Sequence, residues 1–515
     1  MKNTPKSCPF CGVQHPRLVQ SFHPQQDQPL LENLQHRRPD WTPEQGVCLR
    51  CLDGAHQEVL NNLLLENGKE STGLSVLPTP LRLNAHPDFT GKGVTICLID
   101  SGFYVHPDLE FPKNRIKKMV DITNPRRQES YFRQPNGNAW HGAMTSVVCA
   151  GNGHLSGGVY RGLASEAELV LLKVTDGQGH ITGGNITKAL QWVCKNHEQY
   201  GIRIVNLSVA GDDPLSFRQS EVDKAIKTLN EKGIVVVAAA GNDPGAPILP
   251  PANAPEVLTV GGLDDRNTLD PMQQTLYHST YGWTVDGLLK PELIAPAIWL
   301  AAPILPGTPE QQQAAGIFEK LKTAQGDERD DLLRQARQGK FISPHYQHAG
   351  GTSFAAPIVC SIIAQMLEAN PKLSPGMVRE ILLTTARPLP YEDRQRQGYG
   401  VVQAGHAVVQ AGGDAHHQLW ASSPLIDLDK REISFRFHYH DARQVALSGD
   451  FNAWAFDLQL MAQMEDGLWE KIIPLPASGV YQYKYVVDGR DWKSDPLNFY
   501  RAPDGFFGFN SLFFV

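Results

Sequence analysis

The sequence lacks a long hydrophobic run, an excess of basic residues and an apolar segment near its first residues. No apolar run approaches the ~20 residues that a helix needs to span a bilayer, so we expect a soluble protein with no membrane partner. With 47 Lys and Arg against 54 Asp and Glu, the net charge of −7 gives no global basic field for nucleic acid. The stretch from Met1 to Cys8 has no apolar core of signal-peptide length, which predicts a cytoplasmic protein.

The chain has 515 residues, of which 41% are hydrophobic, so it is long enough for about three globular units. Eight cysteines are present, and four of them form two Cys-x-x-Cys pairs. The other four lie singly in apolar segments, and we predict that they are reduced core residues: Cys97, Cys149, Cys194 and Cys360.

Residues 81–411 alternate between short apolar runs and stretches of helical length. The predicted strands are 94–99, 169–174, 202–209, 235–240 and 257–260, and the predicted helices between them are 142–150, 184–198 and 220–231. This alternation predicts an α/β fold, a parallel sheet with helices on both faces. Ligands of such folds bind at the carboxyl ends of the strands.

One small-residue segment, Gly350-Gly-Thr-Ser353-Phe-Ala-Ala-Pro357, is followed by an apolar run of helical length. It predicts that Ser353 lies at a helix N-terminus with its hydroxyl facing solvent, and that Pro357 belongs to the first turn, where no N–H is needed. The alternative for this segment alone is an ordinary helix cap.

Three other stretches favour a catalytic serine. Asp100 ends a predicted buried strand, and His141 lies in the first turn of a predicted helix. The chain order Asp, His, Ser is one of the known orders of a serine-peptidase triad. Asn242 follows the strand 235–240 in a Gly-Asn pair. Together these motifs resemble those of a subtilisin-like serine peptidase over about residues 81–412.

The resemblance implies an endopeptidase in which Asp100, His141 and Ser353 form the triad and Asn242 donates to the oxyanion. It also implies segments that pair with an extended peptide and a small apolar wall for the first specificity pocket: Gly179, His180, Ile181, Ser208, Val209, Ala210, Ala240 and Gly241. A calcium site of the family type is doubtful, because Ala143-Met144 replaces Thr-His and the turn after the aspartate is one residue shorter, although Asp108 could remain a ligand.

Residues 1–54 contain the two Cys-x-x-Cys pairs, Cys8 with Cys11 and Cys48 with Cys51, around a polar loop. Four thiolates in this pattern match tetrahedral zinc ligation and resemble a zinc ribbon. The alternatives are two redox dithiols, unpaired thiols, or substitution of a ligand by one of several nearby histidines. Residues 55–80 are predicted to be a helix and a linker.

Two further regions stand outside the peptidase resemblance. Residues 307–340 read as two charged helices inserted before the serine, which would form a lid, an adaptor surface or a solvated embellishment. After a linker at 412–423, residues 424–515 have the short alternating strands of a β-sandwich.

This sandwich resembles the glycogen-binding module of AMP-activated kinase. The resemblance implies an α-glucan site made by Trp454, Lys484, Trp492 and Asn510. The alternative is a sandwich that has lost glucan binding and contacts a protein. For the whole chain, the rival to a protease is a catalytically silent scaffold that links an adaptor protein to glucan.

Overall fold

The structure is a computed structural model of the chain. It describes residues 6–12, 14–15, 18, 20, 28–48, 51, 55, 74, 76–86, 88–211, 214–268, 271–389, 392–412, 424–427, 430–439, 442–457, 459–464, 468–495, 501–504 and 509–515. The predicted helix and linker at 55–80 and the linker at 412–423 lie largely outside the described residues.

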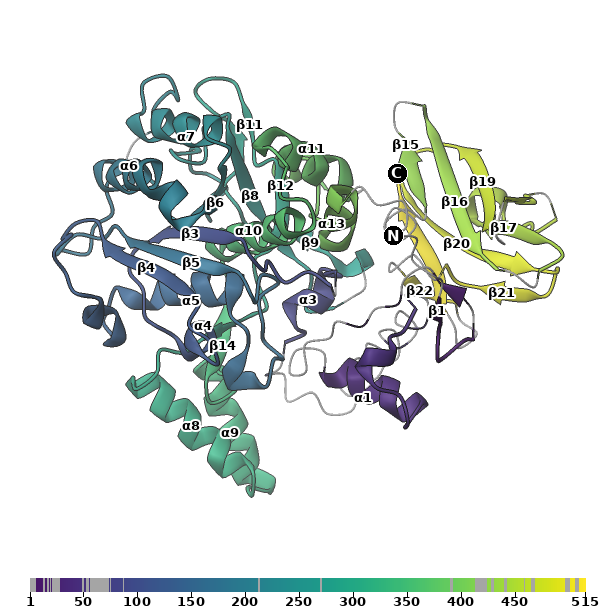
Figure 1. Cartoon of the computed structure of the whole chain (residues 1–515), viewed down its shortest axis with the longest axis horizontal. Coiled ribbons are helices and arrows are strands. Elements are labelled where there is room, and N and C mark those ends of the chain that lie inside the picture. Colours follow the sequence, from purple (N-terminus) through teal and green to yellow (C-terminus); the bar gives the residue numbers. More distant parts are fainter. Residues whose placement is uncertain are drawn as a thin grey trace.

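A parallel sheet is the centre of the middle part of the chain (Figure 1). Its strands are, in spatial order, β12 (Leu293–Pro296), β8 (Val257–Asp264), β7 (Val235–Ala239), β6 (Ile202–Leu207), β3 (Thr95–Asp100), β5 (Glu168–Lys173) and β4 (Ile116–Asp121). The short β9 (Thr275–Leu276) pairs antiparallel with β8. Every strand of this parallel order except β4 has at most one residue that is not buried, as expected for a sheet that is covered on both faces.

Helices cover both faces of this sheet. On one face, α5 (Ala139–Ala150) and α10 (Thr352–Ala369) pack with Ile96 and Leu98 of β3. On the other, α6 (Gly183–Tyr200) and α7 (Glu221–Glu231) pack with Cys97 and Ile99 of the same strand. The predicted architecture is therefore confirmed.

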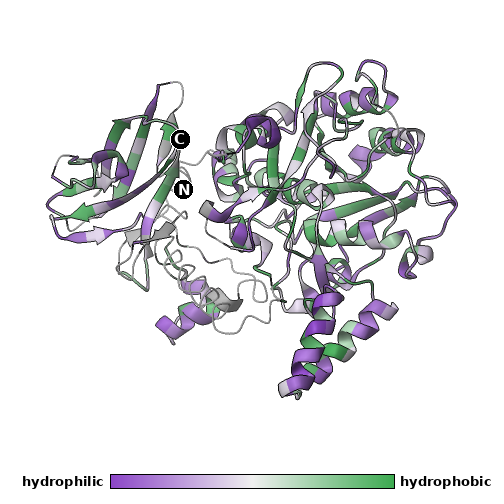
Figure 2. Ribbon diagram, turned by 180° about the vertical axis from the view of Figure 1, so that it is seen from behind, coloured by the Kyte–Doolittle hydropathy of each residue, from purple (hydrophilic) through white to green (hydrophobic). Residues whose placement is uncertain are grey.

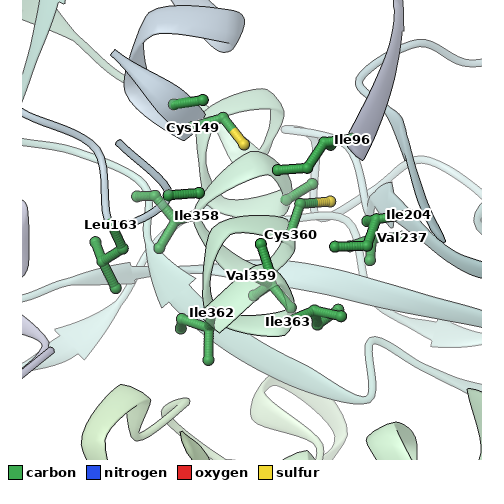
Figure 3. Packing of buried hydrophobic residues seen from close by; sticks show 14 of the residues in the cluster. Ile96, Cys149, Leu163, Ile204, Val237, Ile358, Val359, Cys360, Ile362 and Ile363 are labelled. Atoms are coloured by element: carbon green, nitrogen blue, oxygen red, sulfur yellow. The ribbon is translucent and has the colours of Figure 1, made fainter. Parts of the chain in front are cut away.

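Helix α10 is the central core helix, and its side chains fill the space between the sheet and α5 (Figure 3). By length and composition alone it is apolar enough to cross a membrane, which corrects the expectation that no run approaches that length. However, 83% of it is buried inside the protein, as in the core helix of a globular domain.

The insertion before α10 forms a helical hairpin, as predicted. It consists of α8 (Pro309–Leu321), capped by Thr308, and α9 (Gly326–Gln338), and Figure 2 shows that the hairpin carries both hydrophilic and hydrophobic residues. The hairpin leaves and re-enters the domain through the antiparallel strands β13 (Leu300–Pro303) and β14 (Tyr346–Ala349). Its buried side packs with Leu74, Ile304 and Phe341.

Shorter elements complete this part of the chain. They are α3 (Thr79–Arg82), α4 (Pro107–Glu110), the antiparallel pair β10 (Gly282–Trp283) and β11 (Leu289–Lys290), α11 (Pro375–Thr385), α12 (Arg394–Gln397) and α13 (Ala404–Gly412).

The N-terminal part is a small unit around two buried cysteines. Strands β1 (Lys6–Ser7) and β2 (Gln14–His15) form a hairpin, and the loop that follows contains an unpredicted helix, α1 (Gln28–Arg37). The few buried apolar side chains include Leu34, Trp41 and Val47. So small a core points to a need for additional stabilisation.

The C-terminal part has two antiparallel sheets that share one core, which confirms the predicted β-sandwich. The first sheet is formed by β15 (Leu425–Asp427), β16 (Glu432–His438), β19 (Leu468–Pro474) and β18 (Ala462–Gln463). The second is formed by β17 (Val445–Gly449), β20 (Val480–Val487), β23 (Phe509–Phe514), β22 (Arg501–Pro503) and β21 (Asp491–Lys493).

Candidate active site

The structure brings Asp100 and His141 into direct contact. Asp100 is the last residue of β3 and is fully buried, and His141 is the third residue of α5. The distance from His141 Nδ1 to Asp100 Oδ1 is 2.7 Å. Because a carboxylate can only accept, Nδ1 must carry the proton, which leaves Nε2 of the neutral ring as a proton acceptor.

The surroundings of His141 favour its protonated form. Burial opposes the charged imidazolium, but the charge of Asp100 and the hydrogen bond to it outweigh burial, so that the pKa of His141 is raised above its ordinary value. A base of this kind holds a proton firmly enough to return it to a leaving group.

Ser353 is the second residue of α10, as predicted, and the ring of His141 lies 5.8 Å from that of the next residue, Phe354. The prediction for Pro357 was wrong, because this proline lies in the sixth position of the helix, not in the first turn. Since proline has no N–H, it cannot satisfy the carbonyl of Ser353 four residues earlier. The hydroxyl of Ser208 donates to that carbonyl instead, at 2.8 Å.

Asn242 is held beside the N-terminus of α10. Its Oδ1 accepts hydrogen bonds from the backbone N–H of Thr352 at 2.8 Å and from the Thr352 hydroxyl at 3.1 Å. These contacts assign the amide orientation, because only the oxygen can accept, and Nδ2 therefore remains as a donor. A side chain at Gly351, where φ is +135°, would come within 3.4 Å of Nδ2, so glycine keeps this donor accessible.

The predicted substrate segments lie beyond the carboxyl ends of neighbouring strands. Ser208, Val209 and Ala210 follow β6 directly, and Ala240 and Gly241 follow β7. Gly179, His180 and Ile181 belong to a loop after β5, in which Asp176 Oδ1 accepts from the N–H of His180 at 2.9 Å. All three segments therefore belong to the sheet edge that carries Asp100 and Asn242.

The surroundings of Asp108 do not fit calcium. Its Oδ1 accepts the backbone N–H of Leu155 at 3.0 Å, and its Oδ2 accepts the hydroxyl of Tyr346 at 2.5 Å. Calcium requires six to eight oxygen ligands with free lone pairs, whereas the groups that face this buried carboxylate are hydrogen-bond donors. The Tyr346 hydroxyl thus takes the place that a cation would need.

The four cysteines of the two Cys-x-x-Cys pairs meet in one cluster that could bind a metal. The sulfur atoms of Cys8, Cys11, Cys48 and Cys51 all lie within 4.8 Å of one another. The Sγ atoms of Cys11 and Cys48 are 3.7 Å apart, and tetrahedral thiolates at about 2.3 Å from zinc would be about 3.8 Å apart. The donor set and its spacing therefore fit a tetrahedral metal.

Two aromatic residues of the predicted glucan site are adjacent in the sandwich. The ring centroids of Trp454 and Trp492 are 6.2 Å apart, at an interplanar angle of 39°. Phe456, which the sequence analysis missed, extends this pair, with its ring 6.0 Å from that of Trp492. Lys484 and Asn510 are held by Asp504 and Gln482, respectively.

Sequence reasoning also missed Thr145 and Thr352. Thr145 donates its hydroxyl to Asp100 Oδ2 at 3.0 Å, and Thr352 orients Asn242. The spacing of Thr145, four residues after His141 on the same helix face, was the available signal.

Comparison with known proteins shows which families the chain resembles. Residues 91–400 match the profile of the subtilase family, and residues 432–507 match that of the glycogen recognition site of AMP-activated protein kinase. The serine protease AprX of Bacillus subtilis (strain 168) is 32% identical over 328 residues, which are 62% of this chain and 67% of AprX.

Other known proteins are also similar to this chain. Subtilisin Savinase of Lederbergia lenta is 26% identical over 317 residues, 62% of this chain and 91% of that protein. Among solved structures, sphericase superimposes with a TM-score of 0.42 and 20% identity, covering 58% of this chain and 84% of that one. The profile match spans more than half of the chain, and it shows that the chain belongs to the subtilase family of subtilisin-like serine proteases.

Proposed function

We propose that this protease is an endopeptidase that cleaves protein substrates through a triad of Asp100, His141 and Ser353. The observation that carries the proposal is the 2.7 Å contact between His141 and the buried Asp100. It is supported by the position of Asn242 against Thr352, the residue next to Ser353.

In this mechanism, Ser353 Oγ attacks the scissile carbonyl carbon while His141 Nε2 takes the hydroxyl proton. Asp100 keeps Nδ1 protonated and stabilises the imidazolium. Asn242 Nδ2 and the N–H of Ser353, which has no partner within the helix at its second position, donate to the oxyanion. His141 then protonates the leaving amine, and water hydrolyses the acyl-enzyme in the reverse sequence.

A fluorophosphonate probe tests the nucleophile. We expect labelling of the wild type and none of Ser353→Ala, and we expect Asn242→Ala to keep the fold while turnover falls sharply. Loss of such a donor costs ~3 kcal/mol in the barrier, a magnitude that was measured in subtilisin itself and is taken over here. An unlabelled wild type would favour the rival function, a silent scaffold between an adaptor protein and glucan.

For specificity, we propose that an extended peptide pairs with the segments at 179–181 and 208–210, with Ala240 and Gly241 in the pocket wall. Backbone pairing gives affinity that depends little on sequence. Because that wall is small and uncharged, we expect a large apolar residue before the cut. Sequencing of cleaved termini from a peptide library would test this, and a preference for a charged residue there would contradict it.

For the N-terminal cluster, we propose structural Zn²⁺ bound by Cys8, Cys11, Cys48 and Cys51. Four thiolates complete the tetrahedral coordination of zinc and leave no open position for catalysis. The metal would therefore stabilise the fold of a unit that has a small core. Elemental analysis should give one zinc per chain, and Cys11→Ser should lower that stoichiometry. The competing outcome is a pair of dithiols that oxidise reversibly without bound metal.

For the C-terminal module, we propose α-glucan binding. The tilt of 39° between the rings of Trp454 and Trp492 makes a curved platform, which suits a curved α-linked chain better than a flat one. Trp492 is 41% exposed. Lys484 and Asn510, near the same sheet, would bind hydroxyl groups.

Co-sedimentation with glycogen tests the module. We expect binding by the Ser353→Ala chain, and its loss in Trp454→Ala and Trp492→Ala. Trp283→Ala removes a tryptophan that is 64% exposed in the protease domain and serves as the matched control. If neither the Ser353→Ala chain nor the Trp283→Ala control sediments with glycogen, the module is better explained as a surface for an adaptor protein.

We also propose that the units correspond to residues 1–54, 81–411 and 424–515, and that the protein works in the cytoplasm without nucleic acid or membrane partners. The cytoplasmic proposal is supported by the eight cysteines, all among the described residues, none of which forms a disulfide, as suits a reducing compartment. Cell fractionation would test it, and recovery in an oxidising compartment would contradict it.

A further inference from the structure

We propose that Thr145 is a positioning residue of the catalytic base: its hydroxyl holds the second oxygen of Asp100 and so sets the orientation in which Asp100 receives His141. The inference rests on the proposed triad. It concerns a residue that touches neither the substrate nor any reacting atom.

The two oxygens of Asp100 have different partners. Oδ1 accepts from His141 Nδ1 at 2.7 Å, from the N–H of Ser101 at 2.6 Å and from the Ser101 hydroxyl at 3.2 Å. Oδ2 accepts from the Thr145 hydroxyl at 3.0 Å. Asp100 and Thr145 are both fully buried, so water cannot replace a lost donor without a rearrangement.

The helix makes the arrangement rigid. His141 and Thr145 are four residues apart on α5, and side chains at this spacing lie one above the other on the same face. One carboxylate therefore receives two groups from consecutive turns of one helix, through different oxygens. Rotation of the carboxylate would break both contacts, whereas without Thr145 only the Oδ1 contacts would resist it.

Thr145 could instead serve only the structure of helix α5. The Thr145 hydroxyl also lies 3.2 Å from the carbonyl of Gly142, a contact that threonines commonly make inside helices. A hydroxyl has a single proton, and an ionised carboxylate is a stronger acceptor than a carbonyl. The shorter distance to Asp100 agrees with donation to the carboxylate.

The neighbouring Ser146 provides a matched control. It is buried, and its hydroxyl donates to the carbonyl of Ala143 at 3.0 Å, which is the same kind of contact within the helix. It makes no contact with Asp100 among the described residues. Ser146→Ala therefore removes only the structural contact, whereas Thr145→Val removes the contact with the carboxylate and keeps the shape of the side chain.

The experiment compares these variants in the full chain, with concentrations normalised by fluorophosphonate titration. We expect Thr145→Val to lower kcat about tenfold with little change in KM, as for one lost charge-assisted hydrogen bond, and Thr145→Ser to restore it. Asp100 is the charged group that acts on His141. With one donor fewer on that carboxylate, its pull on the imidazolium proton increases, and the acidic limb of kcat/KM should move to higher pH.

The inference is overturned if Thr145→Val matches Ser146→Ala in kcat and in the pH profile, or if Thr145→Ser fails to restore the wild-type profile. Should Thr145→Val not fold, Thr145→Ala removes the hydroxyl without placing a methyl group against the carboxylate, and it is judged by the same two readouts. An inactive, unlabelled wild type would instead refute the proposed function, so the two failures are distinguishable.

Discussion

The substitution Tyr346→Phe should destabilise the protease domain by removing a donor from a buried carboxylate. The Tyr346 hydroxyl donates to Asp108 Oδ2 at 2.5 Å, and both side chains are fully buried. Burial, strengthened by the charge of Asp108, raises the pKa of Tyr346, so that the hydroxyl keeps its proton at all ordinary pH values. Phenylalanine fills the same space and offers no hydrogen.

The expected loss follows from the acceptor. Leaving a buried charged acceptor without its partner costs about 1.5–3 kcal/mol of the free energy of unfolding, whereas the lost packing is close to zero. Urea unfolding followed by tryptophan fluorescence, in a Ser353→Ala background that prevents self-digestion, measures this loss. Tyr160→Phe is the matched control, because the Tyr160 ring packs 5.1 Å from that of Tyr346.

The same geometry makes a prediction about calcium. Because donors occupy both oxygens of Asp108, millimolar calcium should leave the unfolding midpoint of the wild type unchanged, with zinc held constant. Removing the tyrosine hydroxyl frees one oxygen, but the N–H of Leu155 still faces the other. The reasoning is refuted if Tyr346→Phe is as stable as Tyr160→Phe, or if calcium stabilises the wild type.

Three further predictions concern protons and metal. Because the pKa of His141 is raised, kcat/KM should increase with pH through a midpoint above about 6.5, and a lower midpoint would contradict the assigned base. Burial lowers the pKa of His106 to about 4. Between about pH 6.5 and pH 4, His106 therefore binds a proton in the unfolded chain but stays neutral in the folded chain. Stability should therefore fall by up to ~3 kcal/mol as pH drops from about 6.5 to about 4, and His106→Asn should flatten this dependence in acid titrations followed by fluorescence. Removing metal with a strong zinc chelator should expose the N-terminal unit around Cys48 to limited proteolysis while fluorophosphonate labelling persists; loss of labelling would show that the two units depend on each other.

The core of the protease domain could be predicted from sequence because its strands are continuous apolar runs. The runs that became β3, β5 and β6 were predicted within two residues, since a strand buried on both faces has no polar side. Strand β4 was missed because it is an edge strand with lysines at 117 and 118. Strand β12 was not among the predicted strands, because it is short and ends in proline.

The site was less predictable where contacts join distant segments. The motifs indicated Asp100 and His141. The spacing of Thr145 after His141 places it on the same helix face, but it does not show that the hydroxyl binds the second carboxylate oxygen. The partner of Asp108 is 238 residues away, so no local pattern reveals it. The position of Pro357 was predicted wrongly because the helix starts earlier than the proline suggested, and a tertiary contact from Ser208 binds the carbonyl that the proline cannot satisfy.

The helical hairpin can be inserted shortly before Ser353 in the sequence because the two segments that flank it are paired with each other. Strands β13 and β14 pair from Leu300 with Ala349 to Pro303 with Tyr346, so the hairpin leaves and returns at neighbouring points. Once such a ladder has fixed both ends, the length between them adds little entropic cost.

Replacing residues 309–338 with a short glycine turn should therefore leave the rate of fluorophosphonate labelling near that of the wild type. The unfolding midpoint should fall, because Leu74, Ile304 and Phe341 lose the apolar side of α8 and α9. If labelling is lost while the domain remains folded, the ladder does not isolate the site, and the hairpin itself must shape the approach to Ser353. The contact between Tyr346 and Asp108 would then transmit the effect, since it joins β14 to α4, the helix that begins seven residues after Asp100.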